Sequence, residues 1–145
     1  MNSMGKTRKI INIFMIILLL PVFISGCNQN YVGKVDIIAD GTEHTLVSNW
    51  IFGLHGNTAS DGTRKMPQEI EKDLSPISVT TDMQIKIDAG MRSYTLYDER
   101  YEVYYSLEEF KIPTEKGIYY LCIELAWGSK NKYDGYQYFA KLVVE

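Results

Sequence analysis

The residues whose types could hold a metal ion are few in this chain. His44 and His55 are its only histidines, and Asp61 is the nearest carboxylate that follows them. A zinc site needs three or four His, Cys or carboxylate ligands held together. Two histidines beside one carboxylate, in a stretch that looks like a loop, are more typical of solvated side chains. We therefore expect no metal site and no cofactor.

The sequence patterns that are typical of hydrolases are also missing. Nucleophilic catalysis needs a Ser or Cys with a base in reach, and no Gly-x-Ser-x-Gly elbow is present. Gly53, Gly56 and Gly62 lack the context and the Lys-Ser/Thr pair of a phosphate-binding loop. Carboxylates that could pair for glycoside cleavage stand mostly at expected strand ends, where acidic residues make turns: Asp82, Asp88, Asp98, Glu99, Glu108 and Glu109. The chain is predicted not to be an enzyme; a hydrolase would need two carboxylates that converge in a concave site.

Aromatic side chains beside polar loops are the remaining candidates for a site. Trp50 and Phe52 precede a Gly-rich stretch that holds Asn57, and Trp127 precedes a polar turn that contains Tyr133. Aromatic anchors with adaptable polar neighbours are typical of recognition surfaces. These five residues form our candidate binding surface. The alternative is that both Trp side chains fill the ends of a hydrophobic core, which the strand register favours for Trp127 and leaves open for Trp50.

The N-terminal segment has the order of features of a secretory signal peptide. A basic region with three Lys or Arg precedes an apolar run over residues 10–24, and Ser25-Gly26-Cys27 follows. This ending, with Ile24 three positions before Cys27, resembles the lipobox of bacterial lipoproteins, whose Cys is lipidated and becomes the new N-terminus. The alternative is an uncleaved membrane anchor, but the run is shorter than the roughly 20 residues that a span needs.

Cleavage before Cys27 would divide the chain into a signal peptide (1–26), a lipidated Cys with a polar spacer (27–30) and a domain (31–145) outside the cytoplasm. Two acyl chains on Cys27 suffice for stable membrane attachment. Cleavage removes three basic residues and no acidic one, so the formal charge changes from −3 to −6. An acidic domain has no basic footprint for nucleic acid, which we therefore do not expect as a partner.

Cys122 is the other cysteine of the chain. If Cys27 carries lipid, Cys122 has no partner for an intrachain disulfide. Strand register places Cys122 on the outer face of its strand, as a small, half-buried apolar residue. The alternative, a reactive thiol, is not favoured because no His or cationic side chain is adjacent in sequence to lower its pKa.

A strand, a turn and a second strand are predicted over residues 113–144. With a period of two, one face of this hairpin is apolar: Tyr119, Leu121, Ile123, Leu125 and Trp127 on the first strand, and Tyr138, Ala140, Leu142 and Val144 on the second. That face is the expected core. The opposite face holds Glu124 and Lys141, but also Ile118, Tyr120, Phe139 and Val143. These four either lie under the N-terminal strand and a helix or form a protein-binding patch.

The remaining segments predict more short strands and one helix. We expect an edge strand over 31–39 that ends at Asp40-Gly41, a second strand over 45–52, a long loop over Gly53 to Lys65, and a short helix from Met66 to Leu74 that Pro67 begins. Further strands are expected over 77–79, 83–87, 93–97, 101–107 and 110–112. Short strands at close spacing indicate an all-β fold, an antiparallel β-sandwich.

The start of the last hairpin resembles strand F of immunoglobulin-like domains. There a Tyr makes a corner by hydrogen bonding back to the preceding loop, and Tyr119 is the matching residue. Leu121 stands where an antibody domain has its second Cys. The chain also resembles small Gram-positive bacterial lipoproteins and extracytoplasmic domains appended to sensor-type membrane metallopeptidases. The segments that carry this resemblance are Trp50, Gly53 to Gly62, Pro67 to Leu74, Ser93 to Asp98 and Gly117 to Val144.

These observations and resemblances imply a lipid-anchored protein on the extracytoplasmic face of a Gram-positive cell membrane. Its domain is expected to be an immunoglobulin-like β-sandwich without a disulfide, with one long loop and one short helix. We expect a non-enzymatic role in binding or sensing a protein or an envelope component. The alternative is a module for a glycan or small ligand, which an exposed, nearly coplanar aromatic pair among Trp50, Trp127 and Tyr133 would favour.

Overall fold

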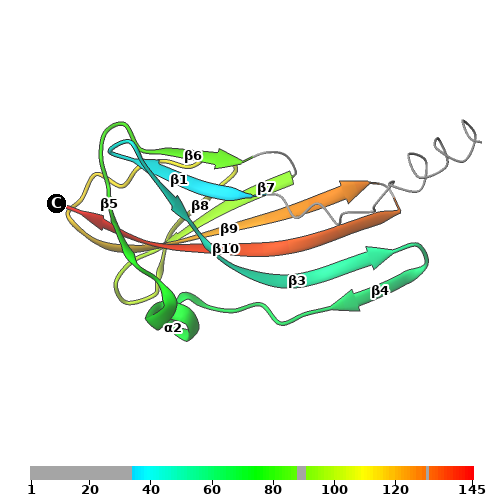
Figure 1. Ribbon diagram of the computed structural model, residues 1–145. Coiled ribbons are helices and arrows are strands. Elements are labelled where there is room, and N and C mark those ends of the chain that lie inside the picture. The colour runs from blue at the N-terminus through cyan, green and yellow to red at the C-terminus, as the bar shows by residue number, and fades with distance from the viewer. Residues whose placement is uncertain (1–33, 88–90, 130) are drawn as a thin grey trace, which may run out of the picture. The chain divides into compact units, whose positions relative to one another are not determined.

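The computed structural model describes residues 34–87, 91–129 and 131–145, which form a β-sandwich of two sheets (Figure 1). The smaller sheet has the order β2-β1-β6 and the larger β4-β3-β10-β9-β7-β8, with β5 pairing in parallel with β10. The strands are Val35–Ala39 (β1), Thr42–Thr45 (β2), Val47–His55 (β3), Thr58–Asp61 (β4), Pro76–Ser78 (β5), Gln84–Ile87 (β6), Met91–Tyr97 (β7), Val103–Leu107 (β8), Gly117–Ser129 (β9) and Lys132–Val144 (β10). The predicted all-β sandwich is confirmed. The expected signal peptide and Cys27 lie outside the described residues.

The long hairpin β9–β10 is the centre of the larger sheet, as its alternating apolar pattern predicts. Its two strands pair in one register from Ser129 opposite Lys132 to Gly117 opposite Val144. The predicted core face is confirmed, because Leu121, Ile123 and Leu142 are fully buried between the sheets. The smaller sheet covers them with Val35 and Ile37 of β1.

The other face of β9 and β10, here called the outer face, is covered by the short helix. The helix predicted from Met66 to Leu74 is confirmed as one α-helical turn, Pro67–Ile70 (α2), followed by a 3-10 turn, Glu71–Asp73 (η1). It begins where Pro67 stands, and the Glu69 carboxylate accepts a hydrogen bond of 2.6 Å from the Met66 backbone N–H.

A second apolar cluster lies between this helical segment and the sheet. It contains Ile70, Leu74, Tyr120, Cys122 and Phe139. Tyr120 and Phe139 are therefore buried under the helix and are not part of a protein-binding patch. The expectation that Cys122 is half-buried is wrong: its exposed fraction is 4%, because α2 and η1 cover the outer face at this point.

The prediction of a long loop from Gly53 to Lys65 is wrong for most of these residues. β3 continues through His55, and a two-residue turn at Gly56 and Asn57 leads into β4, with His55 opposite Thr58. Gly56 has φ +66°, the left-handed region that Gly adopts without strain. β3 extends this far because Phe52, Gly53, Leu54 and His55 pair with β10, which supplies backbone hydrogen bonds that the local sequence does not indicate.

Two smaller expectations also fail. β1 was expected at a sheet edge, but it lies between β2 and β6. Residues 110–112 were expected as a strand, but they have no regular structure. Instead the Phe110 ring packs 6.1 Å from that of Tyr94, and the Tyr105 hydroxyl donates to the Lys111 carbonyl. Side-chain contacts therefore hold this segment where strand pairing was expected.

The larger sheet has features of an immunoglobulin variable-type domain. Its order β10-β9-β7-β8 matches the G-F-C-C′ order of such domains. The Tyr119 hydroxyl donates a hydrogen bond of 3.1 Å to the Glu115 carbonyl, the contact that a tyrosine corner requires. The smaller sheet is built from β1 and β2, which come before every strand of the larger sheet in the described chain, and from β6.

Candidate binding surfaces

Trp127 does not belong to an exposed surface. Only 4% of the residue is accessible, and its indole N–H donates a hydrogen bond of 3.3 Å to the Tyr138 hydroxyl within the core. Its inclusion in the candidate binding surface is therefore wrong. The alternative interpretation, a core position, is the one that strand register favoured.

Trp50 joins β3 to β10 through a single carboxylate. Its indole N–H donates to Asp134 Oδ1 at 3.1 Å, and His55 Nε2 lies 3.1 Å from the same oxygen. Burial of Asp134 favours the protonated form, but the hydrogen bonds from His55 and Trp50 outweigh burial and lower its pKa. Gly62 approaches so closely that a Cβ there would lie 2.6 Å from the Trp50 ring. Trp50 is thus held between β10 and the end of β4.

A β-bulge separates Trp50 from Phe52. Trp50 pairs with Tyr136, whereas Phe52 pairs with Gly135, so Ile51 is the extra residue. Tyr136 and Gly135 are consecutive, and consecutive strand residues point to opposite faces. Trp50 and Phe52 therefore lie on opposite faces of the sheet, although their spacing of two predicts the same face.

The Phe52 ring instead contacts the ring of Tyr133, another residue of the candidate binding surface. Their ring centroids are 5.8 Å apart with an interplanar angle of 77°, so the rings meet edge to face. Gly135 leaves room for the Phe52 ring, because a Cβ there would lie 2.1 Å from a ring carbon. Asn57 lies at the exposed tip of the β3–β4 hairpin. The five predicted residues thus form no single surface, and the only pair among them is Phe52 with Tyr133.

A hollow of about 510 Å³ opens beside Phe52. Its walls include Ala126, Ser93, Glu108 and Glu124, together with Ile51, Arg92 and Leu125. Glu124 is fixed in place by Arg64, which donates two hydrogen bonds of 3.2 and 3.4 Å to its two oxygens. The hollow therefore combines an aromatic wall with a hydroxyl and two carboxylates, a combination that suits a small polar ligand with an apolar side.

The residues between β4 and α2 form a strap across the outer face. Gln137 is 4% exposed, and its side-chain oxygen accepts from Asn49 and from the Lys65 N–H. Asn49 also donates to the Thr63 carbonyl at 2.8 Å. These bonds satisfy the buried amide of Gln137 and hold the strap next to the hollow.

The two edges of the larger sheet differ in character. All four residues of β4 are exposed and three of them are polar. At the opposite edge, β8 exposes Val103 by 60%, Tyr104 by 42% and Leu107 by 36%. We call these three residues the apolar edge. The sequence predicts this strand but not its exposure, although its run of apolar residues contains no Lys or Pro, the residues that usually protect a sheet edge.

Of the carboxylates considered for chemistry, Glu108 lines the hollow together with Glu124, whereas Asp82 and Asp98 lie in turns. Among the residues that the structure describes, no group of three or more His, Cys, Asp or Glu side chains could hold a metal ion. Asp98 accepts hydrogen bonds of 2.9 Å from the backbone N–H groups of Arg100 and Glu102, and Asp82 accepts from the Thr80 hydroxyl. These two carboxylates thus stabilise turns. Asp88 lies outside the described residues.

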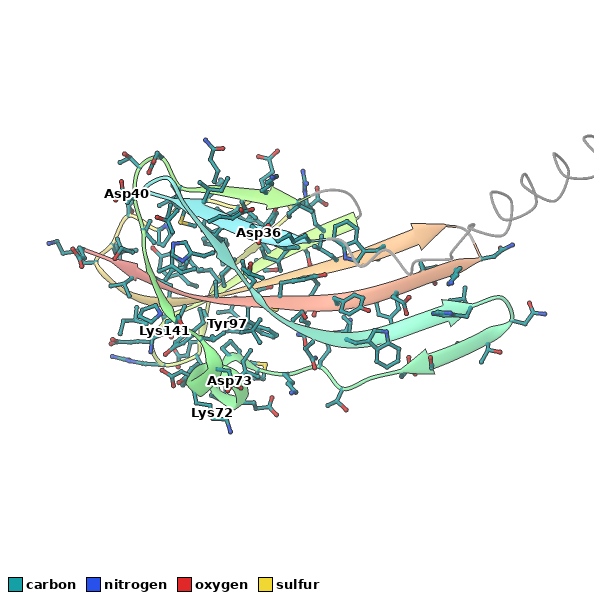
Figure 2. The ribbon with its side chains drawn as sticks, in the orientation of Figure 1. Asp36, Asp40, Lys72, Asp73, Tyr97 and Lys141 are labelled. Carbon is teal, nitrogen blue, oxygen red and sulfur yellow. The ribbon has the colours of Figure 1, made fainter. Side chains whose placement is uncertain are left out.

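A polar cluster that sequence analysis missed attaches η1 to the sheet. The Glu71 carboxylate accepts hydrogen bonds from Lys141 Nζ at 2.8 Å and from the hydroxyls of Tyr101 and Tyr120, each at 2.5 Å. The Lys141 ammonium, followed by the two hydroxyls, lowers the pKa of Glu71 to about 2. Figure 2 shows Lys141 and Tyr97 on the side of the sheet where the helical segment lies, with Lys72 and Asp73 on that segment.

Within the described residues, no helix is both long and apolar enough to cross a membrane. No protein-family model matches the chain, and neither a curated protein nor a solved structure matches it.

Proposed function

We propose that this chain is a lipoprotein attached to the extracytoplasmic face of a Gram-positive cell membrane, and that its domain binds another protein and catalyses no reaction. The attachment is supported by the lipobox-like sequence from Ile24 to Cys27 and the basic and apolar residues before it. The binding role is supported by one observation on the domain, the apolar edge of β8.

The apolar edge presents apolar side chains on both faces of β8, because Val103 pairs with Tyr97 of the outer face and Leu107 pairs with Tyr94 of the core face. Exposed apolar residues are normal when scattered, but a group of them often marks an interaction site. Val103, Tyr104 and Leu107 are three of the six large apolar residues with high exposure in the described part of the chain. Protein binding is favoured over sugar stacking because Trp127 is buried and the Phe52–Tyr133 pair is far from coplanar.

Membrane attachment is tested by feeding cells an alkyne-bearing fatty acid and comparing the natural chain with a Cys27→Ser variant. The natural chain should take up the label and sediment with membranes. The Cys27→Ser variant should neither be labelled nor have its signal peptide removed. Equal labelling of the two chains would contradict lipidation at Cys27, and membrane sedimentation of an unlabelled natural chain would point to the uncleaved anchor.

Protein binding is tested by photo-crosslinking in intact cells. A photoreactive residue at Tyr104 should capture one protein, identified by mass, that is not captured from Ser60 on the polar edge strand β4. The same product should disappear when Leu107→Lys is added. If the lipoprotein is at the membrane and Tyr104 captures nothing that Ser60 does not, the proposed role is contradicted.

A second candidate function is glycan or small-ligand binding in the hollow beside Phe52. It is favoured by the aromatic wall and the fixed Glu124 carboxylate, since sugars present both C–H faces and hydroxyls. Titration with cell-wall oligosaccharides should then shift amide resonances of Ser93 and Ala126, and Phe52→Ala should abolish the shifts. Asn57→Ala, a control at the tip of the same hairpin, should leave them unchanged.

A further inference from the structure

We propose that β8 binds its partner by strand addition, and that the partner segment is extended, apolar in its middle and flanked by Lys or Arg. This inference rests on the proposed function, because it specifies how and with what chemistry the apolar edge would bind a protein.

The backbone of β8 is available for pairing on one side. β8 is the last strand of its sheet and pairs only with β7. In the described part of the chain, no backbone hydrogen bond joins β8 to any segment other than β7. In an antiparallel pair, alternate residues direct their N–H and C=O groups away from the partner strand. The N–H and C=O groups of β8 that point away from β7 can therefore form hydrogen bonds with another strand.

A bulge limits where such pairing would begin. Tyr97 pairs with Val103 and Leu96 with Tyr105, so Tyr104 is the extra residue. Its ring turns toward Tyr119, with centroids 5.2 Å apart. Tyr105, Ser106 and Leu107 remain in regular register opposite Leu96, Thr95 and Tyr94. A partner strand would pair with these residues, and its side chains would cover Leu107 on one face of the sheet.

Charge identifies the kind of segment that fits. Residues 98–109 contain five carboxylates and one guanidinium, and Glu102, Glu108 and Glu109 stand directly before and after β8. A second copy of β8, paired in antiparallel about Tyr105, would bring Glu102 of one chain opposite Glu108 of the other. Like charges in directly opposed positions destabilise a sheet. A segment with Lys or Arg at its ends would instead be attracted to both ends of β8.

The test uses the full chain, purified in detergent, and a fluorescent peptide pool Lys-Lys-X-Thr-X-Thr-X-Lys-Lys, in which X is Val, Ile, Leu or Phe. Anisotropy should show binding that weakens as salt is added. A pool with N-methyl groups on alternate backbone nitrogens loses main-chain hydrogen bonds and should bind at least roughly tenfold more weakly. A pool with Glu in place of Lys should bind weakly as well.

Matched variants locate the site on the chain. Leu107→Lys places a charge on the edge strand and should abolish binding, whereas Ala59→Lys does the same to the opposite edge, β4, and should have no effect. Circular dichroism checks that both variants are folded.

Strand addition is overturned if the N-methylated pool binds as well as the parent pool, if no member of the pool binds, or if Ala59→Lys weakens binding as much as Leu107→Lys. It is also overturned if the chains pair with each other through β8. None of these results affects the crosslink from Tyr104 in cells, so a partner captured there together with a failed peptide test would retain the proposed function and reject only strand addition.

Discussion

Cys122 illustrates how burial decides the chemistry of a single residue. Its thiol lies under the helical segment and accepts a hydrogen bond of 3.7 Å from the Gln137 amide. Burial, followed by the charge of Glu124, raises the pKa of this thiol to about 12. The thiolate, which is the reactive form, is therefore scarce at neutral pH.

We expect Cys122 to resist thiol reagents while the domain is folded. In residues 31–145 it is the only cysteine, so labelling by a disulfide reagent at pH 8 reports on it alone. The folded domain should react at least roughly a hundredfold more slowly than the same domain in guanidinium, given the size of the pKa shift. Equal rates in the two states would mean that the helical segment does not cover the thiol.

Glu71 predicts a dependence of stability on pH. Its pKa is about 2 in the folded domain, against an ordinary value of 4.5. A lowered pKa means that the folded state binds protons less readily than the unfolded state. The stabilisation by Glu71 is therefore fully present above about pH 4.5 and is lost as the pH falls toward about 2.

Glu71→Gln should accordingly lower the free energy of unfolding at pH 7, and its difference from the natural domain should shrink between pH 4.5 and pH 2. Urea unfolding at a series of pH values measures this difference. Asp73→Asn, an exposed carboxylate on the same turn, is the matched control. A pH-independent effect of Glu71→Gln would contradict the ion pair with Lys141 as its cause.

At the scale of elements, the β3–β4 hairpin depends on Asp134. This carboxylate accepts hydrogen bonds from Trp50 and His55 of β3, and the hairpin extends beyond the part of the sheet that the smaller sheet covers. Its free end is also joined to β10 by the backbone pairing of Gly53, Leu54 and His55, and the Gly56 N–H donates to the Asn131 carbonyl at 2.7 Å.

We expect Asp134→Ala to loosen this hairpin before the rest of the domain. The loss of two hydrogen bonds to a charged acceptor should cost about 1–3 kcal/mol, and hydrogen exchange should quicken at residues 52–61 more than in β9. Asp134→Asn keeps an acceptor oxygen and should have a smaller effect. Uniform quickening across both sheets would show that the hairpin is not a separate unit.

Elements differ in how well the sequence predicts them, and the reason is the distance of their partners along the chain. β9 and β10 are adjacent in sequence and alternate clearly, so their register and core face are predicted. The last residues of β3 are in a strand because they pair with β10, about eighty residues later. The Gly-rich composition of this stretch indicates a loop instead. The pair Gly56-Asn57 between two runs is nevertheless a hairpin signal that could have shown the β3–β4 turn.

The candidate site was harder to predict than the fold. A spacing of two placed Trp50 and Phe52 together, but the bulge at Ile51 separates them, and bulges depend on the register of a distant strand. The helix was predicted, yet its hydrogen bonds to Tyr101, Tyr120 and Lys141 were not, because they join residues 30 to 70 positions apart. The apolar edge follows only from knowing which strand is last in its sheet.

At the scale of the whole domain, the two apolar clusters share the same two strands. Leu121 of β9 and Leu142 of β10 face the smaller sheet. Cys122 of β9 and Phe139 of β10 face α2 and η1 on the other side. Disruption of either cluster therefore acts on the same central hairpin. This arrangement implies that both layers unfold together.

We expect Leu142→Ala and Phe139→Ala to destabilise one shared transition. Both side chains are almost completely buried, so each truncation should cost about 2–5 kcal/mol. Denaturant unfolding is followed in a Trp50→Phe background, in which Trp127, between the sheets, is the only tryptophan. Trp127 fluorescence and labelling of Cys122, under the helix, should give coincident curves for each variant. If Phe139→Ala shifts only the Cys122 curve, the helical segment detaches on its own and the outer cluster adds nothing to the stability of the sandwich.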